Sequence, residues 1–163
     1  MKPTLKTVLT DPGHLVAFGF GAGLSPFAPG TMGSIVAIPF YCLLHIVAPG
    51  WWSLVVTSIG FIVGVPISDR TGRWVGDADY GGIVWDEICA MWLVLYFVPF
   101  TVKGILAALV VFRVFDILKP WPISVVDAKI KNGLGVMLDD LLAGLLSVGV
   151  LRAVMSYYPS LLA

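Results

Sequence analysis

Residues 83–98 read Ile-Val-Trp-Asp-Glu-Ile-Cys-Ala-Met-Trp-Leu-Val-Leu-Tyr-Phe-Val, an apolar run whose only charges are the adjacent carboxylates Asp86 and Glu87. The whole chain shares this character, since 58% of its residues are hydrophobic, 12% are charged and the mean hydropathy is +0.95. Soluble domains carry about 25% charged residues, so the composition predicts an integral membrane protein. Ten acidic and ten basic residues cancel, which gives no reason to expect a nucleic-acid partner.

Four further apolar runs are candidates for membrane spans, each of which takes about 20 residues. They cover residues 33–48, 51–68, 103–118 and 138–158. The sequence therefore predicts an all-α, multi-pass membrane bundle of about five spans, forming a single domain over residues 1–163. The piece 15–24 is too short to cross and contains glycines, so we expect it to be re-entrant or interfacial.

Basic residues gather in the N-terminus and in the connections after the second and fourth spans. These residues are Lys2, Lys6, Arg70, Arg73, Lys119, Lys129 and Lys131. By the positive-inside rule we expect the N-terminus and both connections to be cytoplasmic and the C-terminus to lie outside. Nearly all of the acids fall in the same connections or at the span ends that meet them, which predicts an acid-rich cytoplasmic face.

Two carboxylate pairs enter that face from different spans. Asp86 and Glu87 begin the third span, and Asp139 and Asp140 begin the fifth. Oxygen ligands of this kind suit a hard divalent cation such as Mg²⁺, which also keeps positions for water and phosphate. Alternatively, acids at helix N-termini complement the helix dipole, by about 0.3–1 kcal/mol each. Two pairs weaken this alternative, because a carboxylate at the bilayer centre costs about 2.5–3.5 kcal/mol.

The end of the fourth span combines both signs of charge. Arg113, Asp116 and Lys119 are spaced by three and therefore project from one side of a helix before Pro120 stops it. Basic groups beside an acid suit a site that holds both a metal and a phosphate, since arginine grips phosphate oxygens with two donors. The alternative is an ion pair between Arg113 and Asp116 with Lys119 reaching to the membrane edge.

A glycine-rich turn precedes the first span and offers a possible anion seat. Backbone N–H groups at a helix N-terminus bind anions, and the turn comprises Gly30, Thr31, Gly33 and Ser34. Turn chemistry or close helix packing is the favoured explanation of these residues. The chain lacks the features of cysteine, histidine and aspartyl phosphatases, because neither cysteine has an arginine six positions on and His14 and His45 are its only histidines. Metal-activated water is then the most economical nucleophile.

Four segments together resemble the bacterial phosphatidylglycerophosphatase A family. They are Leu-Ser-Pro-Phe-Ala-Pro-Gly-Thr-Met-Gly-Ser at 24–34, Asp-Tyr-Gly-Gly-Ile-Val-Trp-Asp-Glu at 79–87, Phe-Arg-Val-Phe-Asp-Ile-Leu-Lys-Pro-Trp-Pro-Ile at 112–123 and Gly-Val-Met-Leu-Asp-Asp-Leu-Leu-Ala-Gly at 135–144. The resemblance implies a magnesium-dependent phosphatase of the bacterial inner membrane that converts phosphatidylglycerophosphate to phosphatidylglycerol and inorganic phosphate. Matched segment by segment, it implies functional roles for Asp79, Asp86, Glu87, Arg113, Asp116, Lys119, Asp127, Asp139 and Asp140.

Joining the two arguments gives a set of expected roles. Magnesium is expected on Asp86, Glu87, Asp139 and Asp140. The phosphate is expected near Arg113 and Lys119 and near the turn formed by Gly30, Thr31 and Ser34. Asp79 or Asp127 is expected to accept the proton from water. The competing hypotheses are a small membrane carrier for magnesium or an anion, and a CDP-alcohol phosphotransferase, whose Asp-x-x-Asp-Gly-x-x-Ala-Arg motif the sequence lacks.

Overall fold

The computed structural model describes residues 3–162, and the regular structure in that range is entirely helical. Lys2, one of the basic residues predicted to be cytoplasmic, lies outside the described residues. The predicted all-α class is confirmed. The helices are α1 (Leu5–Leu9), α2 (Pro12–Ala17), η1 (Gly19–Leu24), α3 (Pro29–Val47), α4 (Trp51–Val75), α5 (Trp85–Tyr96), α6 (Val102–Leu118), α7 (Ile123–Lys129) and α8 (Gly133–Tyr157).

Each of the five predicted apolar runs forms one helix, but the helices differ in length. Three of the described helices, α3, α4 and α8, are long and apolar enough to cross a membrane, with 19, 25 and 25 residues. The other two, α5 and α6, have 12 and 17 residues. At 1.5 Å per residue they extend roughly 18 and 26 Å, less than the hydrocarbon thickness of about 30 Å. The apolar helices therefore support membrane association, with three candidate spans.

The short helix α5 lies at the centre of the bundle and packs against α3, α4, α6 and α8. Its side chains from Ile88 to Met91 are fully buried, as are Val94 and Leu95. A helix that is apolar nearly all round is buried either in a protein core or in lipid, and the burial of α5 shows that here it is the core. This explains why α5 does not need the length of a span, since protein rather than lipid covers its ends.

Small residues allow α4 to approach its neighbours closely. A Cβ on Gly64 would lie 2.6 Å from the Met137 side chain of α8 and 2.8 Å from the ring of Trp85. Small side chains at helix interfaces permit this kind of packing inside a membrane. They recur every three or four residues along the buried side of α4, at Ser53, Thr57, Gly60, Gly64, Ser68 and Thr71.

The N-terminal piece predicted at 15–24 is not one continuous helix. It comprises the end of α2 and the 3-10 helix η1, and the chain kinks where Gly19, Phe20 and Gly21 take positive φ. The piece packs on the protein, because Phe18 is fully buried and the Val84 N–H donates to the Ala17 carbonyl at 2.8 Å. It thereby closes the N-terminal end of the bundle around the beginning of α5.

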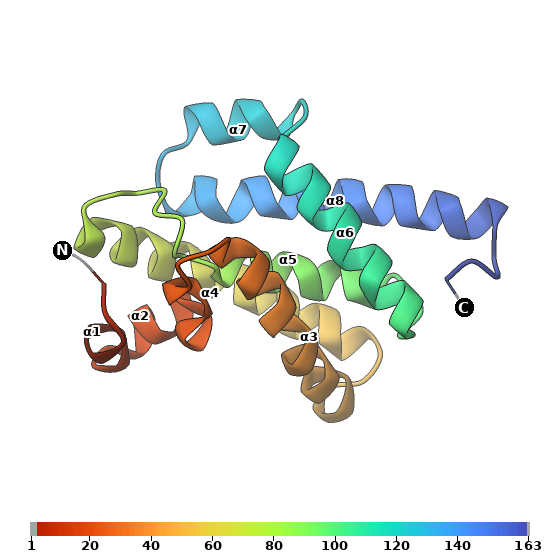
Figure 1. The fold of residues 1–163 in the computed structure, drawn as a ribbon, viewed down its shortest axis with the longest axis horizontal. Coiled ribbons are helices and arrows are strands. Elements are labelled where there is room, and N and C mark those ends of the chain that lie inside the picture. The colour runs from red at the N-terminus through yellow and green to blue at the C-terminus, as the bar shows by residue number, and fades with distance from the viewer. Residues whose placement is uncertain (1–2, 163) are drawn as a thin grey trace.

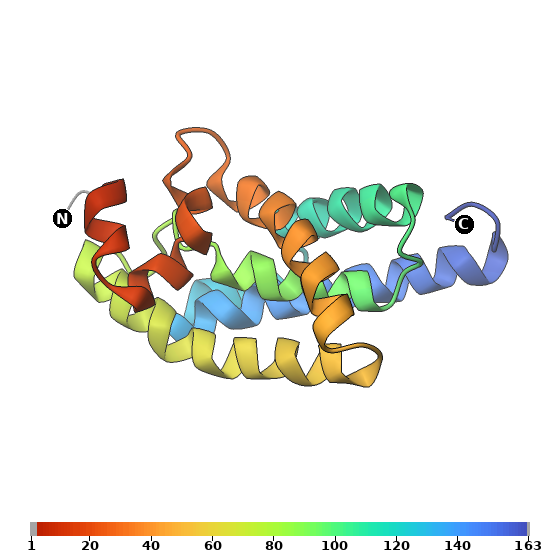
Figure 2. The same cartoon turned by 90° about the horizontal axis from the view of Figure 1, so that it is seen from below.

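The five main helices alternate in direction along the longest axis of the molecule (Figures 1 and 2). The N- and C-terminal ends of the described chain lie at opposite ends of this axis in both views. The short helices α1 and α2, the connection between α4 and α5, and the beginning of α8 gather toward the N-terminal end. Because the helices alternate in direction, the segments that carry most of the charged residues lie together at the N-terminal end of the molecule.

Candidate active site

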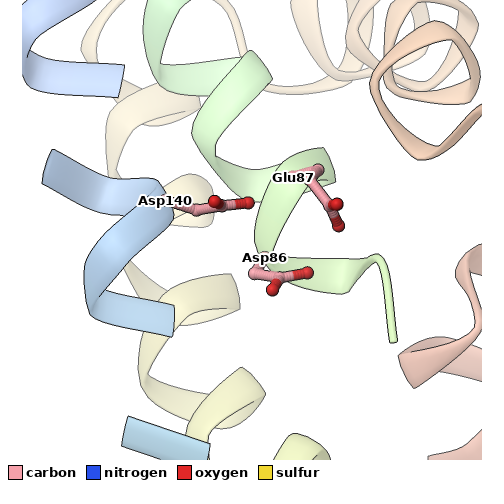
Figure 3. A group of neighbouring side chains, drawn as sticks. All are labelled: Asp86, Glu87 and Asp140. Carbon is pink, nitrogen blue, oxygen red and sulfur yellow. The ribbon is translucent and has the colours of Figure 1, made fainter. Parts of the chain in front are cut away.

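A cluster of three carboxylates joins α5 to α8. Asp86 and Glu87 lie in the first turn of α5, as predicted, and Asp140 reaches toward them from α8 (Figure 3). One oxygen from each residue lies within 4.8 Å of the others, and all three side chains are buried from solvent. Because α8 begins at Gly133, Asp140 projects from inside the helix and not from its first turn. Interaction with the dipole at the helix N-terminus, the alternative explanation for these acids, therefore does not account for Asp140.

Each member of this cluster has an oxygen that lacks a hydrogen-bond partner. Asp86 Oδ1, Glu87 Oε2 and Asp140 Oδ2 are buried, and residues 3–162 supply no hydrogen-bond donor to any of the three. Buried polar atoms are nearly always satisfied in folded proteins, and a buried unpaired charge is costly. Three such oxygens from carboxylates form a donor set that fits a hard cation such as Mg²⁺ and does not fit a soft one.

Asp139 differs from its neighbour Asp140, although the sequence places them side by side. Its Oδ2 accepts a hydrogen bond from Lys119 Nζ at 2.6 Å, and its Oδ1 accepts one from the Asp140 backbone N–H at 3.0 Å. Both oxygens of Asp139 are thus occupied. The structure brings together three of the four predicted metal ligands and places the fourth beside them in an ion pair.

Arg113 forms the wall of the site contributed by α6. Its Nη1 lies 2.6 Å from Asp116 Oδ2 and 3.6 Å from Glu87 Oε1. The side chains of Arg113, Asp116 and Glu87 are all largely buried, at 15%, 12% and 12% exposure. The ion pair considered as an alternative is therefore present, and it lies directly against the carboxylate cluster.

Lys119 ends α6 and pairs with acids of α7 and α8. Its backbone is left-handed, with φ 42°, and its Nζ donates to Asp127 at 2.7 Å and to Asp139 at 2.6 Å. Burial opposes the charge of Lys119, but these hydrogen bonds outweigh burial and raise its pKa. The same hydrogen bond lowers the pKa of Asp127. The spacing by three therefore predicted the Arg113 pair correctly, whereas helix termination redirects Lys119 to α7 and α8.

Asp79 is farther from the cluster, at the exposed rim. It pairs with Lys131 at 3.0 Å, and Lys131 also lies 3.6 Å from Asp127. A chain of ion pairs thus runs from Asp79 through Lys131, Asp127 and Lys119 to Asp139. We did not anticipate the bridging position of Lys131, although its spacing of four from Asp127 was an available signal.

The glycine-rich segment meets the site from α3. The helix begins at Pro29, so Gly30, Thr31 and Ser34 lie within its first turns and not in a separate turn as predicted. A Cβ on Gly30 would lie 2.1 Å from Glu87 Oε1 and 3.0 Å from Arg113 Nη1. The Ser34 hydroxyl donates to the Gly30 carbonyl at 3.0 Å and is buried. Close packing, one of the two explanations considered, is therefore present, and it occurs at the site.

The fold and the cluster define a helical membrane protein with a buried, oxygen-rich acidic site beside an arginine, an arrangement suited to an enzyme that acts on phosphate esters in a membrane. Comparison with known families gives a more specific result. The family described as phosphatidylglycerophosphatase A matches residues 15–155, and the chain belongs to this family of phosphatases.

Individual relatives agree with the family assignment. The chain is 42% identical to phosphatidylglycerophosphatase A of Escherichia coli K12, over 93% of this chain and 88% of that protein. It is 40% identical to phosphatidylglycerophosphatase A of Haemophilus influenzae, over 93% of this chain and 94% of that protein. A Bacteroides thetaiotaomicron protein provisionally named a phosphatidylinositol-3-phosphatase is 36% identical, over 82% and 87% of the two chains. No solved structure matches the chain.

Proposed function

We propose that the chain is a magnesium-dependent lipid phosphatase that hydrolyses phosphatidylglycerophosphate to phosphatidylglycerol and inorganic phosphate. The observation that carries this proposal is the set of three buried carboxylate oxygens without partners, one each from Asp86, Glu87 and Asp140. The family and the names of its members support the substrate. The arginine beside the cluster supports a phosphate as the group that is bound.

The metal would be held by Asp86, Glu87 and Asp140, with Asp139 close by in its ion pair with Lys119. When bound, Mg²⁺ would polarise the phosphoryl group, favour ionisation of water and neutralise charge on the leaving oxygen. The burial of the three carboxylates strengthens their attraction for a cation, because screening by water is weak there.

Arg113 and the first turn of α3 are proposed to bind and orient the phosphate. Arg113 forms an ion pair with Asp116 at 2.6 Å, which keeps its guanidinium beside the cluster, and its buried Nε has no hydrogen-bond partner among the described residues and is left to donate to a phosphate oxygen. The backbone N–H groups of Gly30 and Thr31 belong to the first turn of α3, where N–H groups have no partner within the helix. They are placed to donate to phosphate oxygens beside Arg113.

We assign the transfer of a proton from the attacking water to an acid at the exposed rim of the site, Asp79 or Asp127. Water attacks phosphorus and gives its proton to the acceptor, the bond from phosphorus to the lipid oxygen breaks, and that oxygen takes up a proton to leave as the lipid alcohol, with inorganic phosphate as the other product. Asp79 and Asp127 are the two proposed proton acceptors; both are paired with Lys131, and Lys119 also joins Asp127 to Asp139. Lys119 positions both carboxylates and adds positive charge near the phosphate.

We further propose that all five main helices lie in the bacterial inner membrane, with the N-terminal piece 15–24 at its interface and the site facing the cytoplasm. The basic residues Arg70, Arg73, Lys129 and Lys131 support this orientation by the positive-inside rule. The acyl chains of a phospholipid would then stay in the bilayer while its headgroup reaches the cluster. This arrangement gives a physical reason for building a phosphatase from membrane helices.

The test compares D140N and E87Q with wild-type protein purified in detergent. D77N is the matched control, because Asp77 is exposed in the connection between α4 and α5. We expect phosphate release from phosphatidylglycerophosphate to fall at least about 100-fold in the first two variants, as when one group that stabilises the transition state is removed, and to persist in D77N. Mg²⁺ should raise the melting temperature of wild type and D77N only.

Two results would count against the proposal. Wild-type phosphate release in both D140N and E87Q would remove the cluster from the mechanism. Magnesium uptake into vesicles without any phosphate release would favour the carrier. The position of the acids argues against a carrier, because a transport route for ions needs polar or charged groups along its length, and the only charged side chains near the opposite end of the described helices are the basic Lys103 and Arg152.

A further inference from the structure

An apolar groove lies between α6 and the beginning of α3. Its volume is about 470 Å³, within the range of small-molecule sites, roughly 300–1,000 Å³. Thr31 of α3 and Arg113 of α6 are its only polar lining residues. The remaining lining residues are apolar and recur along one stripe of α6: Leu109, Val110, Val114, Ile117 and Leu118.

The groove borders the carboxylate cluster. Arg113 lines the groove and also lies 3.6 Å from Glu87 Oε1. Gly30, which precedes Thr31, approaches Glu87 so closely that a Cβ would meet its oxygen at 2.1 Å. The wall formed by Thr31 and Arg113 therefore separates the apolar groove from the cluster by a single layer of residues.

The outer side of the groove is open. Val110 is 60% exposed and Ile117 is 67% exposed, although both are large and apolar. In a protein that contacts a membrane, such side chains face lipid. A molecule could thus enter the groove sideways from the bilayer without passing through water.

We infer that this groove holds an acyl chain of the phospholipid substrate, which reaches the site laterally. The inference rests on the proposed phosphatase function and specifies how its substrate is bound. Complementary chemistry supports this occupant: the substrate joins an apolar chain to an anionic headgroup, and the groove joins an apolar stripe to the guanidinium of Arg113. Val110, one turn before Arg113 in α6, contacts the chain.

The experiment narrows the groove with V110W and uses I59W as its control. Ile59 is 53% exposed on α4 and does not line the groove. Each variant is assayed with long-chain phosphatidylglycerophosphate in mixed micelles and with a soluble dihexanoyl analogue. A few methylenes in an apolar pocket change kcat/KM by about tenfold or more, so V110W should lose at least that factor on the long-chain substrate and keep wild-type kcat/KM on the short one. V110L should restore the long-chain activity.

Several results would overturn the inference. If wild type is active and the ratio of kcat/KM on the long-chain and dihexanoyl substrates is the same in V110W and I59W, the groove does not bind the chain. Equal loss on both substrates in a V110W protein that melts like wild type would assign Val110 a structural role. Dissociation of an oligomer by V110W would make the groove an interface between copies. Absence of phosphate release from wild type would instead overturn the proposed function itself.

Discussion

Substitution of Gly30 by alanine tests the geometry of the site most directly. The new Cβ would lie 2.1 Å from Glu87 Oε1 and 3.0 and 3.1 Å from the two terminal nitrogens of Arg113. Real Cβ contacts essentially never fall below 3.0 Å, so the carboxylate or the start of α3 must shift by roughly 1 Å, a displacement that can cost about 100-fold in rate. Glu87 Oε1 and the Arg113 nitrogens are the ends of flexible side chains, which move more easily than backbone, so we expect the loss to appear in activity more than in stability.

The assay measures kcat/KM for phosphate release together with the melting temperature. We expect G30A to lose about 100-fold in kcat/KM and to show a smaller rise in melting temperature with Mg²⁺ than wild type. G149A is the control, because a Cβ on Gly149 in α8 meets nothing within 4 Å and alanine favours a helix over glycine by roughly 1 kcal/mol. A G30A protein as active as G149A would refute the placement of Gly30 against Glu87.

Three other outcomes are expected. K119M should lower the free energy of unfolding in detergent by about 1.5–3 kcal/mol, because it removes the hydrogen bond that Asp139 accepts at 2.6 Å; unchanged unfolding would contradict this. Burial lowers the pKa of His14 from 6.5, so the unfolded chain takes up a proton first on acidification. Stability should therefore fall below about pH 6.5, and H14Q should melt without this dependence; an equal slope in both proteins would exclude His14 as the cause. D77C should resist an impermeant thiol reagent in intact cells while S160C, at the other end of the molecule, is labelled; the reverse pattern would invert the proposed orientation.

The sequence predicted the helical class and the carboxylates because both depend on local composition. Apolar runs such as 83–98 bury best as helices, since a helix satisfies its own backbone hydrogen bonds without water. Charges that interrupt such runs are costly, so Asp86, Glu87 and Asp140 could be identified as functional candidates without a structure. The family resemblance rested on the same residues, and the match over 15–155 confirms it.

Other predictions from sequence were limited by what spacing alone can describe. Composition does not give helix length, and α5 has only 12 residues because its neighbours surround it. Helical periodicity put Lys119 on the same side as Arg113, but the left-handed residue that ends α6 sends its side chain to Asp127 and Asp139. The piece 15–24 likewise follows a kinked path set by contacts with α3 and α4.

By itself, then, the sequence determined which charged side chains are candidates for binding a cation and a phosphate and which segments form helices. Only the tertiary structure decided that Asp140 joins Asp86 and Glu87 while Asp139 pairs with Lys119. Adjacent residues on a helix point about 100° apart, so two neighbouring aspartates meet different partners, and those partners come from other helices. The approach of Gly30 to Glu87 has the same origin, because it depends on how α3 packs against α5.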